Sequence, residues 1–210
     1  MSVLYELLTA ADGASADDVA TALAAFRHDA GDALTRHDVV PIGGGGPRGE
    51  STFPFDVVVE AFAERPHDLP AYAPAIDAAR SFRFEVDETA IREGSAPLRL
   101  VILSKRNAAM DPDRFRAYLQ GTHGPLTLAT EDYARHLRGY RQSYIRPGTL
   151  RRLDGGEVPF ERQFDGVVQF WFDDRDGMMA AYSSPGYRGI MNPDEEVFIT
   201  RGYSLAFATA

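Results

Sequence analysis

The strongest constraint on the fold is an internal repeat, because one order of predicted strands and helices occurs twice along the chain. Strand patterns rich in β-branched and aromatic residues alternate in both halves with helical patterns, in which apolar residues recur every three or four positions. In the first half the predicted strands are residues 3–9, 55–64 and 83–91, and the predicted helices are residues 16–34 and 69–82. In the second half the predicted strands are residues 98–105, 164–174 and 197–210, and helices open at Asp111-Pro112 and at Arg175.

Superposing the two halves of the sequence supports this repeat. With a shift of 95 positions and no gap, Leu8, Ala14, Asp18, Ala22 and His28 fall on Leu103, Ala109, Asp113, Ala117 and His123. With a shift of 109 positions, FDVVVEAFA at residues 55–63 falls on FDGVVQFWF at residues 164–172. Small residues fill Arg92 to Pro97, between the halves, so we predict two domains, at residues 1–95 and 96–210.

We interpret the three strands and two helices recognised in each half as parts of the β-α-β-β-α-β order of a ferredoxin-like unit, whose helices cover one face of a four-stranded antiparallel sheet. The other face of that sheet needs a cover, and a second copy of the same sheet supplies one. The sequence therefore predicts an α+β fold in which two tandem ferredoxin-like halves form an intramolecular α+β barrel, with a cavity between the sheets. Whether two such single-chain barrels join as a homodimer stays open.

Composition and charge exclude several functional classes. The chain has no cysteine, which excludes disulfides, thiolate catalysis and cysteine-ligated metals. A net charge of −9 argues against nucleic acid and anionic membrane surfaces as partners, because both require basic patches. No window reaches the roughly 18 apolar residues of a membrane span, and residues 1–13 lack the basic start of a signal peptide. We therefore expect a cytoplasmic protein whose partner is a small-molecule ligand.

Alternation along the strands predicts which side chains line the cavity. In residues 166–172, one face carries Val167, Gln169 and Trp171, and the other carries Gly166, Val168, Phe170 and Phe172. The corresponding faces of the first half carry Val58, Glu60 and Phe62, and Val57, Val59 and Ala61. The purely apolar faces should meet helices and the mixed faces should meet the cavity, because small-molecule pockets combine an apolar lining with a few polar groups. The alternative is that Trp171 and Phe62 simply fill the barrel.

His123 is the strongest candidate for an acid–base group, within the sequence Gly-Thr-His-Gly-Pro. We predict a break between two helical segments here, with Pro125 restarting the helix. An imidazole titrates near neutral pH, so it can both accept and donate a proton. Gly121 and Gly124 would let backbone or ligand approach closely. The structural alternative is a helix-end histidine followed by a glycine C-cap.

The other candidate site residues come from the same patterns. Tyrosine and glutamine side chains can donate hydrogen bonds to a developing oxyanion, and a buried Glu60 could act as a base, with a surface carboxylate as its alternative. We assign catalysis to His123, Tyr118 and Gln169. We assign ligand binding to Trp171, Val167, Phe62, Glu60, Tyr133, Tyr140 and His28. No pair of histidines has the spacing of a metal site with a carboxylate, so neither a metal nor a cofactor is predicted.

Residues 98–210 resemble the EthD family, which is named for proteins of ethyl tert-butyl ether degradation and belongs to the dimeric α+β barrel superfamily. The resemblance is carried by Lys105-Arg106, by Phe115 and Tyr118 in F-x-x-Y, by His123, Pro125 and Leu126 in H-x-P-L, and by FWFD at residues 170–173. His28 is instead followed by Asp-Ala-Gly. The resemblance implies a barrel, which family members usually build as homodimers, and a cofactor-free decarboxylase or dehydratase activity like that of some relatives in fungal polyketide pathways.

Three functional hypotheses follow. In the first, the protein binds a small, mostly apolar molecule, aromatic and polyketide-like compounds included, and His123 moves a proton without any cofactor. The reaction would be that of a lyase, a dehydratase or a cofactor-free monooxygenase in catabolism or secondary metabolism. In the second, the same cavity carries a hydrophobic metabolite without chemistry. In the third, taken from the wider superfamily, the protein binds haem through an axial histidine. The colour of the purified protein tests the third hypothesis, and turnover separates the first two.

Overall fold

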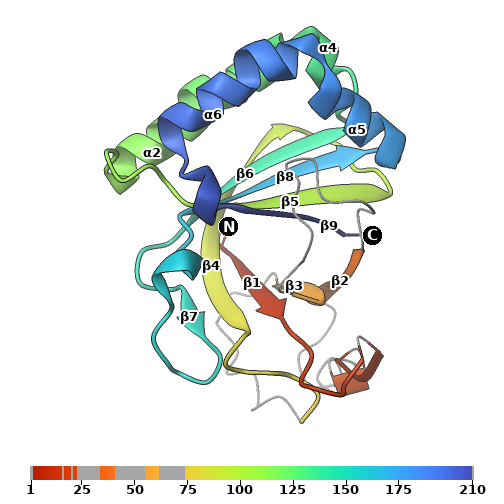
Figure 1. The fold of residues 1–210 in the computed structure, drawn as a ribbon, viewed down its shortest axis with the longest axis vertical. Helices are drawn as coiled ribbons and strands as arrows, with labels where there is room; N and C mark the ends of the chain where they lie inside the picture. The colour runs from red at the N-terminus through yellow and green to blue at the C-terminus, as the bar shows by residue number, and fades with distance from the viewer. Residues whose placement is uncertain are drawn as a thin grey trace. The chain divides into compact units, whose positions relative to one another are not determined.

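The structure is a computed structural model of the 210-residue chain, and it describes residues 2–15, 17–19, 21–22, 34–40, 55–61 and 74–209. Its fold is α+β, as predicted (Figure 1). The strands are β1 (Ser2–Leu8), β2 (Leu34–Val40), β3 (Val57–Ala61), β4 (Phe82–Arg92), β5 (Leu98–Ser104), β6 (Gly139–Ile145), β7 (Arg151–Arg152), β8 (Gly166–Phe172) and β9 (Leu205–Thr209). Among the described residues they follow the order β1-β3-β2-β9-β5-β8-β6-β4-β7. Because β1 also pairs with β4, this order closes into an antiparallel β-barrel, which confirms the predicted fold class.

The chain divides into two compact units, and each contains segments of both sequence halves. The first unit comprises Met1–Val39, Thr52–Asp87 and Ile145–Phe160, and the second comprises Val40–Ser51, Glu88–Tyr144 and Glu161–Ala210. The domains predicted at residues 1–95 and 96–210 stay a prediction. Within the described ranges, no helix has the length and apolar character needed to cross a membrane.

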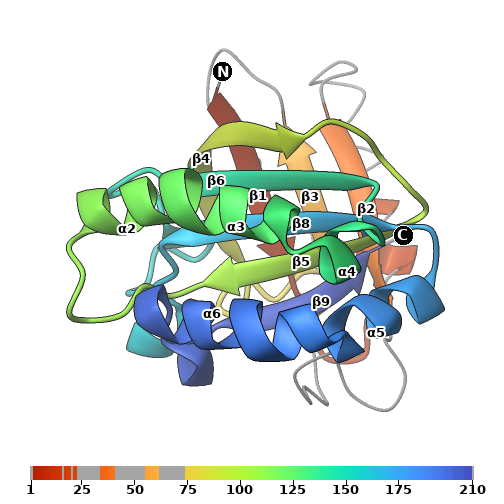
Figure 2. The ribbon, with the colours of Figure 1, turned by 90° about the horizontal axis from the view of Figure 1, so that it is seen from above.

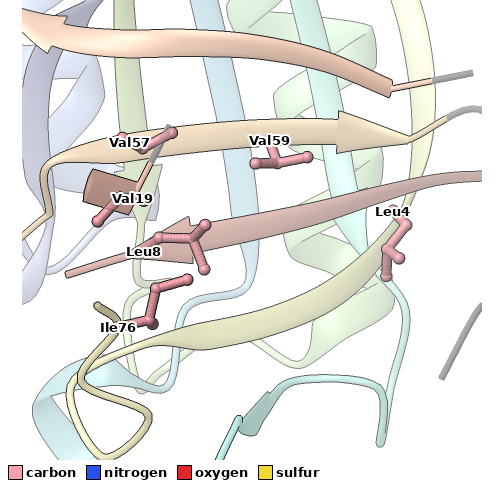
Figure 3. Close-up of a cluster of buried hydrophobic side chains, with 6 residues drawn as sticks. All are labelled: Leu4, Leu8, Val19, Val57, Val59 and Ile76. Carbon is pink, nitrogen blue, oxygen red and sulfur yellow. The ribbon is translucent and has the colours of Figure 1, made fainter. Parts of the chain in front are cut away.

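In the first unit, β1 pairs with β3 and β4, and β2 pairs with β3. One face of these strands packs into a hydrophobic cluster, shown in Figure 3: Leu4, Leu8, Val19, Val57, Val59 and Ile76. Val19 comes from helical residues 17–19, so Val57 and Val59 of β3 do face a helix. The predicted orientation of this strand is therefore confirmed.

In the second unit, helices cover one face of β5, β6, β8 and β9 in two rows, as Figure 2 shows. The first row is α2 (Pro112–Tyr118), the π-helix η1 (Leu119–His123), α3 (Gly124–Ala129) and α4 (Glu131–Ala134). The second row is α5 (Arg175–Ser183), the π-helix η3 (Tyr187–Met191) and α6 (Asn192–Phe198). Two 3₁₀ turns, η2 (Phe160–Arg162) and η4 (Arg201–Tyr203), complete the helical elements of residues 74–209.

Local sequence signals explain where the two rows of helices start. The side chain of Asp111 accepts a hydrogen bond from the backbone N–H of Arg114 at 2.8 Å, and Pro112 occupies the first turn of α2, as predicted. Asp174 caps α5 in the same way, accepting from the backbone N–H of Gly177 at 2.8 Å. Each cap satisfies a backbone donor that the first helical turn leaves without a partner.

Three sequence-based assignments differ from the structure. Strand β2 begins at Leu34, the expected end of the first helix, and continues through residues 35–40, to which the sequence assigned no element. Its pairing with β3 stabilises a segment that carries no clear strand pattern of its own. Residues 74–81, expected to be helical, form turns, and Ile76 makes an isolated β-bridge with Ala10. The final strand is shorter than expected, because Val197 and Phe198 still belong to α6.

Candidate functional site

The helical path through His123 is continuous, so the predicted break at this residue is wrong. His123 and Gly124 both have right-handed helical dihedrals, with φ of −64° and −59°. The glycine C-cap alternative is wrong for the same reason, since a cap of that kind needs a positive φ. The helix widens into one π turn instead, in which the backbone N–H of Gly124 donates to the carbonyl of Leu119.

The π turn explains how Pro125 fits inside a continuous helix. A proline ring clashes with the carbonyl four residues earlier in an α-helix, and a π turn relieves such crowding because its hydrogen bonds span five residues. The second row of helices has the same arrangement. At the end of η3, the backbone N–H of Asn192 donates to the carbonyl of Tyr187, and Pro193 is the next residue. Both rows thus place a π turn just before an X-Pro step.

The two rows are joined by a carboxylate that binds both His123 and Tyr118. Nδ1 of His123 lies 2.7 Å from Oδ2 of Asp194, and the Tyr118 hydroxyl donates to Oδ1 of the same carboxylate at 2.6 Å. Tyr118 ends α2 and His123 ends η1, while Asp194 lies in the first turn of α6. The side chains of His123 and Asp194 are only 5% and 10% exposed, so water screens their interaction weakly.

The protonation states of this triad follow from its hydrogen bonds. Burial raises the pKa of Asp194, but the hydrogen bonds from His123 and Tyr118, together with the charge of His123, outweigh burial and leave that pKa below its usual value. Burial and the neighbouring Asp194 raise the pKa of Tyr118 to about 12. At neutral pH, therefore, Asp194 is ionised and accepts hydrogen bonds from the hydroxyl of neutral Tyr118 and from Nδ1 of His123.

Nε2 of His123 is the open position of the triad. With Asp194 on Nδ1, neutral imidazole carries its proton there and presents a lone pair on Nε2. No described residue hydrogen-bonds Nε2. The imidazole rests on Phe198, whose ring centroid is 4.7 Å away, and the ring of Phe115 lies 6.0 Å from that of Phe198. A basic nitrogen in an apolar setting can move a proton to or from a bound molecule.

A second polar cluster lies between the first helical row and strand β6. The Thr127 hydroxyl donates to the carbonyl of His123 at 2.8 Å. Nε2 of Gln142 donates to the Tyr140 hydroxyl at 2.6 Å. Burial raises the pKa of Tyr140, which stays a neutral phenol. Thr127 thus bonds the backbone of His123, while Gln142 and Tyr140 form a hydrogen-bonded pair on β6.

Strand β8 places Gln169 on the opposite face of the sheet from His123 and Tyr118. The ring of Phe170 lies 6.0 Å from that of Tyr133 in α4, and a Cβ on Gly166 would lie 3.3 Å from Phe115 in α2, so these residues face the helices. Alternation turns Val167, Gln169 and Trp171 to the other face, as predicted. All three are buried; whether they line a cavity stays a prediction.

Trp171 lies between two guanidinium groups on that other face. Cζ of Arg99 is 6.0 Å from the indole centroid and Cζ of Arg141 is 5.2 Å from it, both within range of cation–π attraction. Arg99 Nε donates to the Thr209 hydroxyl at 2.9 Å, and Arg141 Nη1 donates to Glu88 at 3.2 Å. The indole is thus held by polar neighbours as well as by packing.

The remaining predicted site residues are spread over both units. Glu60 is buried in the first unit, with Oε2 3.8 Å from Nε2 of His37, so the surface alternative for this carboxylate is wrong. Tyr133 belongs to an aromatic cluster with Tyr182 and Tyr187, at centroid distances of 5.6 Å from each. His28 and Phe62 lie outside the described residues, and their assignments stay predictions.

Sequence reasoning missed Asp194 and Gln142. Asp194 follows Asn192-Pro193 and reads as an ordinary acidic residue in the first turn of a helix, which is where such residues are common. Gln142 lies in a strand with no signal that its amide is buried. Across the described ranges, no group of three or more His, Asp or Glu side chains gathers as metal ligands would.

Comparison with known proteins identifies one family and several proteins of similar fold. Residues 107–202 match the EthD domain, which confirms the resemblance predicted for the second half of the chain. No curated protein matches this sequence.

Three solved structures resemble the whole chain at low sequence identity. A major regulator of staphylococcal pathogenesis is 10% identical, with a TM-score of 0.51, over 99% of this chain and 97% of its own. Candidate monooxygenases from Fusobacterium nucleatum and Lactobacillus acidophilus are 8% and 10% identical, with TM-scores of 0.50 and 0.49. The matches cover 99% and 100% of this chain and 90% and 92% of theirs, respectively. At these identities the likeness concerns the fold alone.

Proposed function

We propose that this chain, which carries an EthD domain across residues 107–202, binds a small, mostly apolar molecule and acts on it by proton transfer at His123. The observation that supports the proposal is the buried triad of Tyr118, Asp194 and His123, which leaves one imidazole nitrogen open. The reaction belongs to the lyases, dehydratases or cofactor-free monooxygenases. These classes share one requirement, the removal or delivery of a proton at a carbon or oxygen atom of the substrate.

Each member of the triad has a separate task in such a reaction. Nε2 of His123 accepts a proton from the substrate and later returns it. Asp194 accepts a hydrogen bond from Nδ1–H, which fixes the tautomer of the ring and stabilises the imidazolium that forms. Tyr118 donates to the other oxygen of Asp194 and helps to hold its pKa down, so the carboxylate does not take the proton itself. Tyr118 and Asp194 are therefore positioning residues, and His123 is the catalytic residue.

The surroundings of the triad support an apolar substrate. Phe198 is buried against His123, and Phe115 is buried next to Phe198. An imidazole cation formed in such a setting depends on Asp194 for its charge balance. A net charge of −9 further disfavours nucleic acid as a partner. We also propose that the protein acts in the cytoplasm, either as one single-chain barrel or as a homodimer of such barrels.

The decisive experiment compares three histidine variants on one substrate panel. Aromatic β-keto acids and polyketide-like phenols are incubated with purified protein, and products are detected by mass spectrometry. His123→Ala should reduce turnover about 10²- to 10⁴-fold, as expected for a group that transfers a proton. His136→Ala is the matched control, because His136 lies in the same unit and its only described ring contact is with Arg135. His28→Ala should also retain most activity, since His28 lacks the glycine-proline setting of His123.

The same experiment separates catalysis from simple binding. If ligands bind the wild-type protein but no product forms, the protein is a carrier for hydrophobic metabolites, and His123 and Asp194 only join two helices. Equal and severe losses of turnover in His123→Ala and His28→Ala would show two working sites, contrary to the proposal.

A further inference from the structure

We propose that Gln142 is a specificity-determining residue, whose Oε1 accepts a hydrogen bond from a hydroxyl group of an aromatic ligand bound beside His123. This inference rests on the proposed function and names the substrate class of that same site. It is carried by a buried acceptor that lacks a partner, by the hydrogen bond from the other end of the same amide to Tyr140, and by the glycine next to His123 that lies against it.

The Gln142 side chain is fully buried, but only one end of its amide forms a hydrogen bond. Oε1 has no hydrogen-bond partner among the described residues, whereas Nε2 donates to the Tyr140 hydroxyl. A buried amide oxygen without a partner costs stability, because it gives up its hydrogen bonds to water and gains none in return. Such atoms are uncommon in folded proteins and call for a specific explanation.

The Gln142 amide is held by one hydrogen bond, in which Nε2 donates to the Tyr140 hydroxyl at 2.6 Å. With Nε2 engaged in this way, Oε1 occupies the unpartnered position.

Gly124 lies against the Gln142 amide on the helix side. A Cβ on Gly124 would lie 3.2 Å from Nε2 and 3.5 Å from Oε1 of Gln142, and 3.5 Å from the side chain of Ile91. Gly124 directly follows His123, so the glycine that packs against the amide and the histidine that would move the proton are neighbours in the chain. By contrast, a Cβ on Gly121 would meet nothing within 4 Å.

The chemistry of this position selects the kind of ligand group. Oε1 of an amide only accepts hydrogen bonds, so the group must be a donor. A carboxylate would present only acceptors, and it would be repelled by ionised Asp194 on the neighbouring triad. The neighbours of the site are aromatic and aliphatic, so a phenol or an enol on an aromatic framework satisfies both requirements.

The test measures the binding of three probes by calorimetry. The first, 1-naphthol, has the hydroxyl; the second, 1-fluoronaphthalene, has nearly the same size but no donor; and the third, 1-naphthoate, carries a negative charge. Wild-type protein should bind 1-naphthol about threefold to tenfold more tightly than 1-fluoronaphthalene, the range expected for one net hydrogen bond. It should bind 1-naphthoate most weakly.

Two variants of the amide site should abolish this preference in different ways. Gln142→Met removes the acceptor, and the affinity for 1-naphthol should fall to that for 1-fluoronaphthalene. Gly124→Ala leaves the amide in place but puts a methyl group against it, and should have the same effect on 1-naphthol. Gly121→Ala is the matched control; it adds the same methyl group one turn earlier, where it contacts nothing, and should keep the wild-type preference.

Each outcome decides a separate point. If wild-type protein binds 1-naphthol and 1-fluoronaphthalene equally, or if Gln142→Met keeps the preference, the role of Gln142 is overturned while the proposed function stands. If no probe binds, the aromatic ligand of the proposed function is wrong and this inference fails with it. A lost preference in Gly121→Ala as well would show that the effect arises from the helix and not from the amide.

Discussion

The imidazole of His123 and the ring of Phe198 are in contact, with centroids 4.7 Å apart and planes inclined by 53°. Phe198 lies one helical turn after Asp194 on α6, so a single face of this helix supplies both the carboxylate and the apolar surface that the histidine contacts. A ring held by one short hydrogen bond and one tilted ring–ring contact has little freedom to rotate. The histidine is therefore oriented before any ligand arrives.

The free energy of unfolding of Asp194→Asn should depend less on pH in the acidic range than that of the wild type. The pKa of Asp194 in the folded chain is below the ordinary value of 3.8, so its ionised form stabilises the fold at higher pH, and this contribution is lost as the pH falls through the lowered pKa. The variant should lose about 1–3 kcal/mol at neutral pH. Thermal unfolding between about pH 2 and pH 7 should show the two proteins converging in acid. Asp113→Asn, at an exposed position on α2, is the control, and a pH-independent gap would contradict the prediction.

Tyr118→Phe should raise the pKa of Asp194 without unfolding the protein. The substitution removes one of the two side-chain hydrogen bonds that favour the ionised carboxylate, while its ring can keep the contact with Phe198 at 5.4 Å. Carboxyl ¹³C chemical shifts, recorded across an acid titration, measure the change directly. An unchanged Asp194 titration would mean that Tyr118 does not tune the triad.

The two glycines beside His123 should respond differently to alanine. Both lie in helical backbone, where alanine is favoured over glycine by about 0.5–1 kcal/mol. Gly121→Ala should gain this amount, because its new methyl group meets nothing within 4 Å. Gly124→Ala should gain less, because its methyl group lies 3.2 Å from the Gln142 amide. Urea denaturation gives both values, and a larger gain for Gly124→Ala would contradict the packing described.

Trp171 should report ligands on the inner face of its sheet. It is the only tryptophan in the chain, is 8% exposed and lies between Arg99 and Arg141. If Val167, Gln169 and Trp171 line a cavity, naphthol-like aromatics should change its emission. A folded Trp171→Ala variant that binds every tested aromatic as tightly as the wild type would rule this cavity out.

Residues 98–210 expressed alone should form a homodimer or aggregate. The face of β8 with Val167, Gln169 and Trp171 is buried in the whole chain, and a large apolar face without a cover drives association. Analytical ultracentrifugation distinguishes the outcomes. A stable, soluble monomer of this fragment would argue against two halves that share one core.

The sequence predicted those features that depend on local pattern. The alternation of Val167, Gln169 and Trp171 with Gly166 and Phe170 gave the two faces of β8 correctly, because a strand has a fixed period of two. Asp111-Pro112 gave the start of α2 for a similar reason, since a cap involves only neighbouring residues.

Features that depend on distant parts of the chain could not be predicted in this way. Asp194 lies 71 positions from His123, and nothing in either segment shows that they meet. The break at His123 was wrong because proline and glycine usually end helices, whereas here a π turn lets the helix continue through them. Strand β2 depends on its partner β3 in the same way.

The π turns at Leu119–His123 and Tyr187–Met191 also bear on how relatives of this protein are aligned. A π turn holds one residue more than the α-helical turn it replaces, and each residue of an α-helix advances by about 100°. A relative with a one-residue gap in either segment would therefore present a different helix face to the sheet and to the opposite row. Such a gap is small in an alignment. It would nevertheless identify a relative in which the counterparts of His123, Asp194 or Gly124 lie on a different face of the helix.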